Sequence, residues 1–484
     1  MFFSNPDLGR CPIQNSQKFH KLLSALLILS GILYSTFLVL ENRNHVFYSD
    51  GGLKYLMVKQ YSTGDFSLSL HLSKPDWVDR IWQEGYHPFS KPFVYNSGDE
   101  HYVAFPFSFQ IISTPFYMLF GFWGLYLIPL VSLWFIWIRF FFLCNHFSLK
   151  IVITNLSLVT LIFASPLLIY GSIFWEHTLS ILLTFYGFEF IVKSLGRSRN
   201  NPRGNLSSSI IAGTLFGLSV WLRPEAFIML FLLLFAAFLY SLKTDDRLLL
   251  VFVKSAVIVT TSFFILNWIL TGHIFGIHGI QIIENRHSIS DRAMMYFKIF
   301  KDLHIELIEK IPQSILFVLG SFFFLTSKDQ KHYFHITILI LCFCIISPAL
   351  LPNAGGKQWG PRYFLLMLPI ISFLTACQLD LFFKHKSRCA KWVFTGFLLL
   401  ATCFGIFKNS YQGVEILLFD RKQSRGIKDY IKKSKAQHII TNTTFLSIGM
   451  AELQQDKTFF STEENNDLHH LLSRLKDNGV IHYL

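Results

Sequence analysis

Eleven segments of the chain are apolar enough and long enough to cross a lipid bilayer, and this feature limits the fold more than any other. A membrane-spanning helix needs about 20 mostly apolar residues. Hydrophobic residues make up 52% of the 484 positions and charged residues only 15%, whereas a typical soluble domain carries about 25% charge. These figures exclude a soluble globular enzyme and a disordered chain, and they predict an α-helical polytopic membrane protein with about 11 transmembrane helices. The segments lie near residues 19–40, 122–143, 149–168, 178–194, 207–222, 225–242, 250–271, 313–327, 332–351, 361–380 and 391–407.

The charges between these segments set the predicted orientation, because short cytoplasmic loops are enriched in Lys and Arg. A twelfth apolar stretch, Phe105–Phe120, contains two prolines. If it lies at the outer interface, five successive basic loops share the side of the N-terminus, and if it crosses, the pattern inverts. We therefore predict an N-terminus inside and a C-terminus outside. The basic residues are Arg139 and Lys150; Lys193, Arg197, Arg199 and Arg203; Lys243 and Arg247; Lys328 and Lys331; and Lys384, Lys386, Arg388 and Lys391.

This topology divides the chain into three parts. A cytoplasmic tail covers residues 1–18, and a transmembrane domain covers residues 19–407 with a large outer loop at 41–104. Residues 408–484 form a small C-terminal α/β domain outside the membrane. That domain is expected to contain a strand at His438–Thr441, an amphipathic helix at Asp467–Lys476 and a last strand at Val480–Leu484.

Several function classes find no support in the sequence. The net charge of +13 is scattered over the loops, and without a basic patch on a soluble domain we expect no nucleic-acid partner. The chain has no Walker loop and no other Gly-rich phosphate motif, which argues against an ATP-driven pump. The histidines lack the spacing of a metal site, so we expect no cofactor, although a divalent metal stays open.

Charged residues near a bilayer cost several kcal/mol unless they face a partner or a cavity. Asp50 follows the first span and precedes Gly51 and Gly52, which allow close backbone approach. Lys54 lies four residues further on, so the two side chains are expected to pair on one helical face. The alternative is an aspartate that merely caps the helix.

Two further polar groups lie at predicted outer ends of spans. Glu176 and His177 open the fourth span, where they would bind a sugar, orient a phosphate or act as a base, or else form a headgroup-level belt beside Trp175. Arg223 and Glu225 flank Pro224 in a very short turn. They either neutralise each other or form a phosphate-binding arginine held by a carboxylate.

Two later loops add cations, glycines and aromatic rings. His278 lies in the third outer loop, which runs from about residue 271 to 312, and the string Lys357-Gln358-Trp359-Gly360-Pro361-Arg362-Tyr363 precedes the tenth span. Cations suit a phosphate and Trp suits a sugar face. Together these groups would surround a cavity for an amphiphile with an anionic head, and a lipid-phosphate sugar fits that description.

The order of these elements resembles the GT-C fold of integral-membrane glycosyltransferases, in particular the protein O-mannosyltransferases, the lipid A aminoarabinose transferase and their bacterial relatives. The resemblance covers about residues 20–380. It is carried by Asp50 after the first span, by the proline-bearing stretch that ends at Gly121, and by the strings Phe174-Trp-Glu-His177, Leu222-Arg-Pro-Glu225 and Gln358-Trp-Gly-Pro-Arg-Tyr363.

The resemblance implies a role for each matching residue. Asp50 takes the place of the catalytic base, and Arg362 and Arg223, followed by Lys357 and His177, match the residues that hold the lipid phosphate. Many relatives carry a second acid beside the first, where this chain has glycines. Asp99 and His101, which flank Glu100, are the expected substitutes. The remaining residues of the expected substrate-binding set are Lys54, Glu176, Glu225, His278, Gln358 and Tyr363.

The resulting prediction is a glycosyltransferase of the bacterial inner membrane. It would move a sugar from a polyprenyl-phosphate donor to a glycan, lipid or protein acceptor of the cell envelope on the outer face. Three alternatives stay open: a transporter or flippase of lipid-linked sugars, a glycan polymerase or ligase, and a membrane partner without activity. A transporter would carry its charged residues at membrane mid-depth, and a polymerase or ligase would depend on outer-loop Arg and His rather than on Asp50. An inactive partner would tolerate substitution of Asp50, Arg223 and Arg362.

Overall fold

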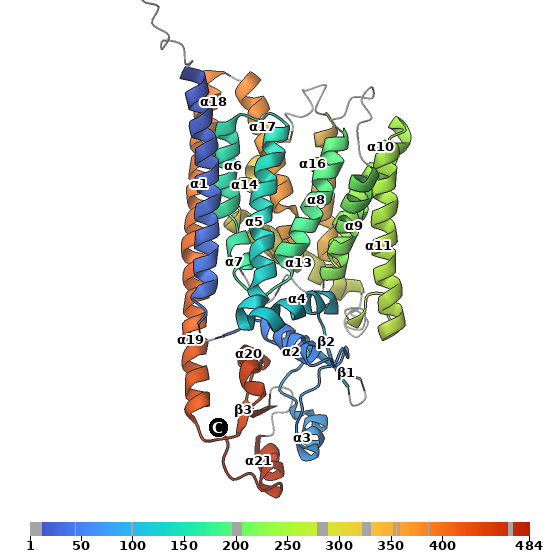
Figure 1. Ribbon diagram of the computed structural model, residues 1–484, viewed down its shortest axis with the longest axis vertical. Coiled ribbons are helices and arrows are strands. Elements are labelled where there is room, and N and C mark those ends of the chain that lie inside the picture. The colour runs from blue at the N-terminus through green and yellow to red at the C-terminus, as the bar shows by residue number, and fades with distance from the viewer. Residues whose placement is uncertain are drawn as a thin grey trace, which may run out of the picture.

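The computed structural model describes residues 12–43, 45–97, 100–195, 206–277, 289–321, 331–351, 355, 359–385, 387–462 and 468–484. Long helices run side by side in a bundle, and a smaller domain extends from its lower end (Figure 1). The bundle contains α1 (Pro12–Leu40), α5 (Phe122–His146), α6 (Ile151–Phe163), α8 (His177–Leu195), α9 (Leu206–Leu222), α10 (Ala226–Thr244), α11 (Arg247–Thr271), α14 (Gln313–Gly320), α16 (Lys331–Ile346), α17 (Leu368–His385) and α18 (Arg388–Ile406).

Each of the eleven predicted segments overlaps one of these helices, and the polytopic helical fold is confirmed. Six helical stretches in the described part of the chain are long and apolar enough to cross a membrane unaided. The outer surface of α1 carries an exposed apolar stripe that includes Leu22, Leu26, Leu29 and Leu33, as expected for a lipid-facing helix. The count of eleven crossings and their orientation stay predictions.

Small residues allow close helix packing in the bundle. Gly213 and Gly217, one turn apart on α9, face α11. A Cβ atom at these positions would lie 2.3 Å from the carbonyl oxygen of Phe252 and 2.7 Å from that of Ala256. These two glycines therefore set the distance between α9 and α11.

Helix α4 (Phe107–Phe120) corresponds to the ambiguous proline-bearing stretch. It has 14 residues, so it is about 21 Å long, shorter than the hydrocarbon core of about 30 Å. Figure 1 shows it lying across the lower end of the bundle. This placement agrees with the predicted interfacial position.

Two predicted spans differ from the observed helices. The segment 149–168 is interrupted, because α6 ends at Phe163 and α7 (Leu167–Gly171) begins only after Pro166, which cannot continue a helix. The last span does not end at 407. It continues through η5 (Phe407–Gly413) into α19 (Val414–Lys433), so the predicted domain boundary at residue 408 falls inside a continuous helical stretch.

The domain at the lower end, here called the extramembrane domain (residues 45–106 and 434–484), combines two distant parts of the chain. The first contains α2 (Gly51–Ser62), α3 (Asp76–Ile81), η1 (Trp82–Tyr86) and the antiparallel pair β1 (Val94–Ser97) and β2 (Glu100–Val103). The second contains the parallel pair β3 (His438–Thr441) and β4 (Thr458–Ser461), with α20 (Thr444–Gly449), η6 (Ala451–Gln454) and α21 (Leu468–Asp477).

The expected α/β pattern of the C-terminal part is only partly correct. The strand at His438–Thr441 is present, and α21 lies where the amphipathic helix is predicted. The predicted strand Val480–Leu484 does not form as a strand, although its end pairs with β3 through a bridge between Tyr483 and His438 and two backbone hydrogen bonds of Leu484. The partner of β3 is β4, whose four residues are all buried and therefore lack the alternation that marks a half-buried strand.

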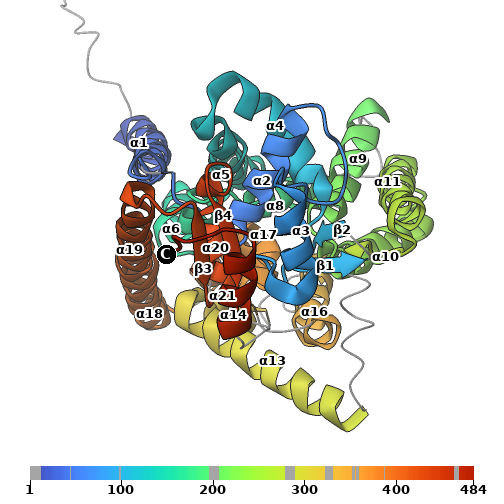
Figure 2. The same ribbon diagram turned by 90° about the horizontal axis from the view of Figure 1, so that it is seen from below.

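The two parts of this domain share one hydrophobic core. Val78, Trp82 and Tyr86 pack with Phe460 and Leu471, and the Trp82 Nε1 donates to the carbonyl oxygen of Phe459 at 3.0 Å. The first outer loop and the C-terminal tail are thus one packed unit. The remaining described elements are η3 (Ser347–Leu350), η4 (Arg362–Met367) and α13 (Ile289–Lys310), which runs along one edge of the molecule when it is seen from below (Figure 2).

Candidate active site

The site lies where the extramembrane domain meets the bundle. Asp50 directly precedes α2 and is 3% exposed. Its side chain caps no backbone N–H, and instead its Oδ2 lies 3.3 Å from the Nζ of Lys54. The predicted Asp50–Lys54 pair is therefore present, and the alternative of a simple capping aspartate is wrong.

The glycine pair after Asp50 allows the predicted close backbone approach. A Cβ atom on Gly52 would lie 1.9 Å from the carbonyl oxygen of Ile448 on α20, and one on Gly51 would lie 3.4 Å from that of Phe174. The start of α2 is therefore fixed between the bundle and the C-terminal part of the extramembrane domain. Asp50 is held at this contact.

Glu176 and His177 lie at the start of α8, and both are 3% exposed. The Glu176 carboxylate bridges two cations, with Oε2 at 2.5 Å from the Lys54 Nζ and Oε1 at 3.2 Å from an Arg223 Nη1. A belt at the headgroup level would leave these side chains exposed. That alternative is therefore wrong, because Glu176 lies in a buried ion-pair network.

Arg223 connects this network to the turn between α9 and α10. Its guanidinium contacts Glu225, Glu176 and the ring of His177. Glu225 therefore pairs with Arg223, as both interpretations made from sequence require, but it is not the only partner of the guanidinium. Phosphate binding by Arg223 stays a prediction.

Arg362 and Tyr363 begin η4 after Gly360, whose φ of +78° favours glycine. The Arg362 Nη2 donates to the Tyr363 hydroxyl at 2.9 Å. The guanidinium groups of Arg362 and Arg223 lie 4.8 and 5.9 Å from the centre of the Tyr363 ring. This tyrosine therefore lies beside both arginines.

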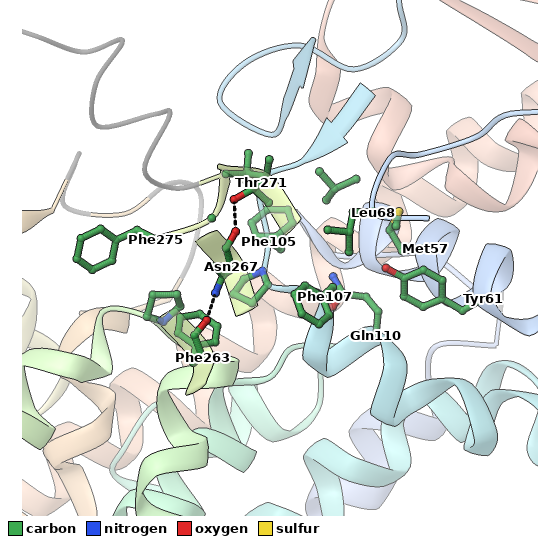
Figure 3. Close-up of a pocket in the computed structure, with 16 residues that line it drawn as sticks. Met57, Tyr61, Leu68, Phe105, Phe107, Gln110, Phe263, Asn267, Thr271 and Phe275 are labelled. Atoms are coloured by element: carbon green, nitrogen blue, oxygen red, sulfur yellow. Dashed lines mark hydrogen bonds between the residues drawn. The ribbon is translucent and has the colours of Figure 1, made fainter. Parts of the chain in front are cut away.

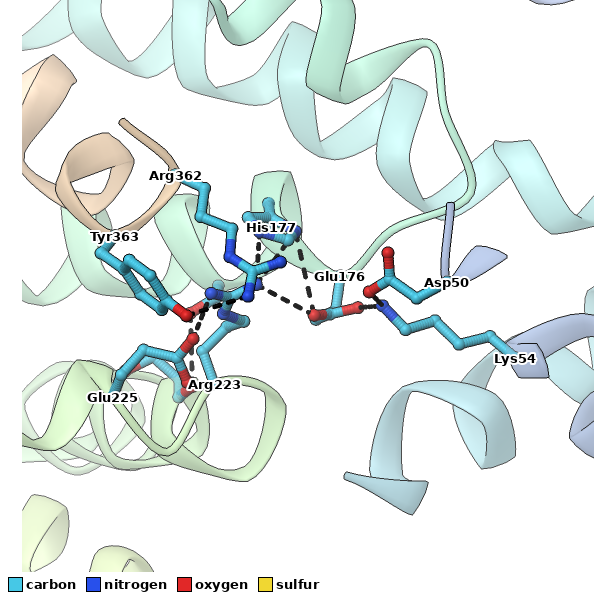
Figure 4. Close-up of polar contacts among 10 residues, drawn as sticks. Asp50, Lys54, Glu176, His177, Arg223, Glu225, Arg362 and Tyr363 are labelled. Atoms are coloured by element: carbon cyan, nitrogen blue, oxygen red, sulfur yellow. Dashed lines mark hydrogen bonds and ion pairs between the residues drawn. The ribbon is translucent and has the colours of Figure 1, made fainter. Parts of the chain in front are cut away.

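Eight of the predicted residues thus form one group, here called the charged cluster (Figure 4). It contains three cations, three carboxylates and two uncharged polar rings, and most of these groups are buried. Burial of so many charges is costly unless they are paired and hydrogen-bonded. The members are Asp50, Lys54, Glu176, His177, Arg223, Glu225, Arg362 and Tyr363.

Two buried atoms of the charged cluster retain hydrogen-bonding capacity. Neither the Oδ1 of Asp50 nor the Nε of Arg362 has a partner within the part of the chain that the structure describes. Burial raises the pKa of Asp50, but the combined lowering effects, led by the charges of Lys54 and Arg362, outweigh it, so that the pKa lies below its ordinary value. Asp50 is therefore an ionised carboxylate with one oxygen available.

The other predicted residues do not join this group in the described structure. His101, on β2, stacks on His87 with ring centres 3.9 Å apart and contacts Asn96. Asp99, His278, Lys357 and Gln358 lie outside the described residues. Trp359, expected to suit a sugar face, instead donates to Asn409 and lies under the Nζ of Lys310.

Sequence reasoning missed the aromatic walls of the charged cluster. The rings of Tyr170 and Trp175 lie 4.9 and 5.0 Å from that of His177, and the Lys54 Nζ lies 4.7 Å from the centre of the Phe105 ring. Phe105 opens the proline-bearing stretch Phe105–Phe120, which was the available signal. Such rings exclude water and strengthen the electrostatic interactions among these charges.

An apolar groove adjoins the charged cluster (Figure 3). It is partly open to its surroundings, and its lining includes Phe105, Phe107, Pro224, Phe263 and Asn267. Phe105 contacts Lys54 and Pro224 follows Arg223, so the groove begins where the charges end. No sequence pattern marked it, because its walls come from α2, α4, the α9–α10 turn and α11.

Metal ligation finds no additional support. Among the residues that the structure describes, no group of three or more His, Cys, Asp or Glu side chains is placed to hold a metal ion.

Comparison with known proteins identifies the fold. No family model matches the sequence, and no curated protein matches it. Among solved structures, ArnT from Cupriavidus metallidurans bound to undecaprenyl phosphate matches with a TM-score of 0.50 and 12% identity, over 89% of this chain and 75% of ArnT. The apo state of ArnT matches with a TM-score of 0.46 and 10% identity, over 88% and 85% of the two chains.

The match with the bound form of ArnT shows the fold. ArnT is a lipid A aminoarabinose transferase with the GT-C fold, and this chain has the same polytopic GT-C-like architecture. The expected resemblance is thereby confirmed at the level of the fold.

Proposed function

We propose that this protein transfers a sugar from a polyprenyl-phosphate donor to a hydroxyl group of a cell-envelope acceptor. The observation that carries the proposal is the charged cluster, in which Asp50 and Arg362 each keep a buried polar atom that has no partner among the described residues. The GT-C-like fold, shared with a protein solved with undecaprenyl phosphate, supports the same class of donor.

The position of the groove supports an amphiphilic donor. The apolar chain would lie along Phe105, Phe107 and Phe263, and the phosphate would lie against the cations that begin beside Phe105 and Pro224. One molecule with an anionic head and a long apolar tail thus matches both surfaces. A water-soluble nucleotide sugar would leave the groove unused.

Asp50 is the best candidate for the base. Both oxygens of Glu176 are engaged, one by Lys54 and the other by Arg223. In Asp50 only Oδ2 contacts Lys54, while Oδ1 has no partner among the described residues. A general base needs a free lone pair within hydrogen-bond reach of the proton that it removes, and Asp50 meets this condition better than Glu176.

The proposed step is a single displacement. The acceptor hydroxyl gives its proton to Asp50 while its oxygen bonds to the anomeric carbon of the sugar. The bond from that carbon to the phosphate oxygen breaks, and its electrons stay on the phosphate, which gains one negative charge. Arg362, Arg223 and Lys54 would stabilise that charge, and such electrostatic stabilisation is commonly the largest contribution to catalysis.

The orientation follows as part of the proposal. With the N-terminus in the cytoplasm, the charged cluster and the extramembrane domain lie on the outer face of the inner membrane. The acceptor would be a glycan, a lipid or a protein of the cell envelope.

The test uses membranes that carry wild type or Asp50→Asn at equal protein level. They receive radiolabelled polyprenyl-phosphate sugars and native envelope acceptors, with and without EDTA to decide whether a divalent metal takes part. We expect transfer by wild type and a loss of about 10²–10⁴-fold in Asp50→Asn. Asp65→Asn, an exposed aspartate of the same domain that pairs with His71, is the matched control and should retain full activity.

Other outcomes separate the alternatives. Transfer that survives Asp50→Asn would keep the enzyme class and remove Asp50 as the base. Movement of labelled donor across a proteoliposome membrane without transfer would favour a transporter of lipid-linked sugars.

A further inference from the structure

A second pocket lies inside the extramembrane domain and shares no lining residue with the groove. It is a partly open pocket between the loop after η1, strand β1 and the end of β4. Its lining includes His87, Phe89, Ser90, Asn96 and Ser461. Both distant parts of the chain therefore contribute to its walls.

His87 is the unusual residue of this pocket. It is 5% exposed, and its Nε2 has no hydrogen-bond partner within the described residues. The ring is held by stacking on His101 at 3.9 Å and by an edge contact with Trp82 at 5.1 Å. Buried polar atoms are nearly always hydrogen-bonded, so a fixed and unpartnered Nε2 in a pocket wall indicates a missing ligand.

The ring is neutral, because burial and then the neighbouring His101 lower the pKa of His87 to about 3. The other ring nitrogen, Nδ1, lies 3.0 Å from the carbonyl oxygen and 3.3 Å from the amide nitrogen of Phe89. Either tautomer therefore has a partner at Nδ1, and Nε2 can donate or accept. A hydroxyl is the ligand group that also does both.

The rest of the pocket mixes polar and apolar groups, as a carbohydrate site does. The hydroxyls of Ser90 and Ser461, the amide of Asn96 and the single cation Lys91 lie on the same lining as Phe89 and Val94. A sugar ring presents hydroxyls at its edge and C–H groups on its faces, which match these polar and apolar groups. Ser90 also bonds Thr444 of α20, which fixes this wall to the C-terminal part of the domain.

We propose that this pocket binds a neutral sugar residue at a non-catalytic site. The proposal goes beyond the transfer reaction, because binding here requires neither a lipid-linked donor nor the charged cluster. It gives the extramembrane domain a role in holding envelope glycan close to the membrane surface.

The test measures binding of free sugars to the full-length chain. The protein is placed in nanodiscs without glycolipid and in the absence of glycoside detergents. Saturation-transfer difference NMR is recorded with the methyl glycosides of glucose, galactose, mannose and N-acetylglucosamine. His87→Phe keeps a ring and removes both nitrogens, Asn96→Ala alters an exposed wall residue, and His71→Phe is a control in the same domain.

We expect at least one glycoside to give a signal with wild type. The signal should fall at least tenfold in His87→Phe and severalfold in Asn96→Ala, and stay unchanged in His71→Phe. Asp50→Asn should bind as wild type does, so failure of the transfer reaction and failure of this site are distinguishable. Absence of binding by wild type, or equal binding by the pocket variants, would overturn the proposal. If His87→Phe does not fold, Asn96→Ala decides the question.

Discussion

The two ends of α8 each carry a buried glutamate that pairs with two cations, but the two networks differ in their surroundings. At the end near the extramembrane domain, Glu176 contacts Lys54 and Arg223, whose side chains are 1% and 9% exposed. At the opposite end, Glu189 contacts Arg139 and Lys193, at 33% and 29%. The second pair of cations therefore reaches solvent or headgroups, whereas the first is enclosed.

The networks differ as well in what they leave unpaired. Glu189 uses Oε2 for Arg139 at 2.6 Å and Oε1 for Lys193 at 2.5 Å, so both oxygens are engaged. The network of Glu176 continues to Asp50 and Arg362, where two buried atoms have no partner in the described structure. A long cation that keeps its head in water costs little, but an enclosed charge with an unused bonding atom costs several kcal/mol. We infer that the first network is kept for a ligand and the second for stability.

The largest expected difference between the two networks is in catalysis. Arg362→Met should lower the rate of sugar transfer at least 100-fold, because one group that stabilises developing charge is commonly responsible for a factor of about 10²–10³. Arg139→Met removes the same charge at the opposite end and should change the rate of folded protein less than about threefold. Initial rates with a labelled polyprenyl-phosphate sugar measure both. Equal losses would show that the arginines act only on the fold.

Substitution of the two glutamates should also affect stability differently, although this difference is smaller than the one in catalysis. Glu176→Gln leaves two enclosed cations with weaker partners, and we expect a loss of about 2 kcal/mol in the free energy of unfolding. A fully uncompensated buried charge costs about 3–5 kcal/mol, and here Asp50 and Glu225 still offset part of it. Glu189→Gln should cost about 1 kcal/mol or less, since its cations reach solvent. Unfolding followed by tryptophan fluorescence compares them, and a larger loss in Glu189→Gln would contradict the comparison.

The sequence predicted most of the bundle and most of the charged cluster. Uninterrupted apolar runs identify helices because a bilayer excludes unpaired backbone groups, and charged residues at the ends of such runs stand out because they are costly. That reasoning found Asp50, Glu176, Arg223 and Arg362 without knowledge of their contacts. It also misplaced the end of the last helix, since α19 continues as an amphipathic helix beyond the apolar run.

Features that form only when distant segments of the chain pack together could not be predicted from the sequence pattern. The groove depends on how Phe105, Pro224 and Phe263 come together, and nothing in their local spacing records it. Strand β4 was missed because all its residues are buried, and His101 was assigned to the site although it stacks on His87. Long-range packing decides each of these, and a single sequence does not show it.

The smallest effect is a shift in pH dependence, and it tests the electrostatics of the charged cluster directly. Because Lys54 and Arg362 lower the pKa of Asp50 against the effect of burial, the carboxylate stays ionised at neutral pH and down to about its unperturbed pKa of 3.9. The depressed pKa also contributes stability above the unfolded-state pKa, which is lost as the pH falls through the folded-state pKa.

Lys54→Met removes the stronger of the two lowering charges and leaves Asp50 buried. The pKa of Asp50 should then rise, and the acidic limb of the pH–rate profile should move to higher pH by about one pH unit or more. Lys193→Met removes the corresponding cation beside Glu189 and should leave the limb where it is in wild type. Transfer rates of the three proteins, measured from pH 8 down to the lowest pH at which each stays folded, locate the limb in each. A limb that moves equally in both variants, or in neither, would show that the titrating base is not the carboxylate beside Lys54.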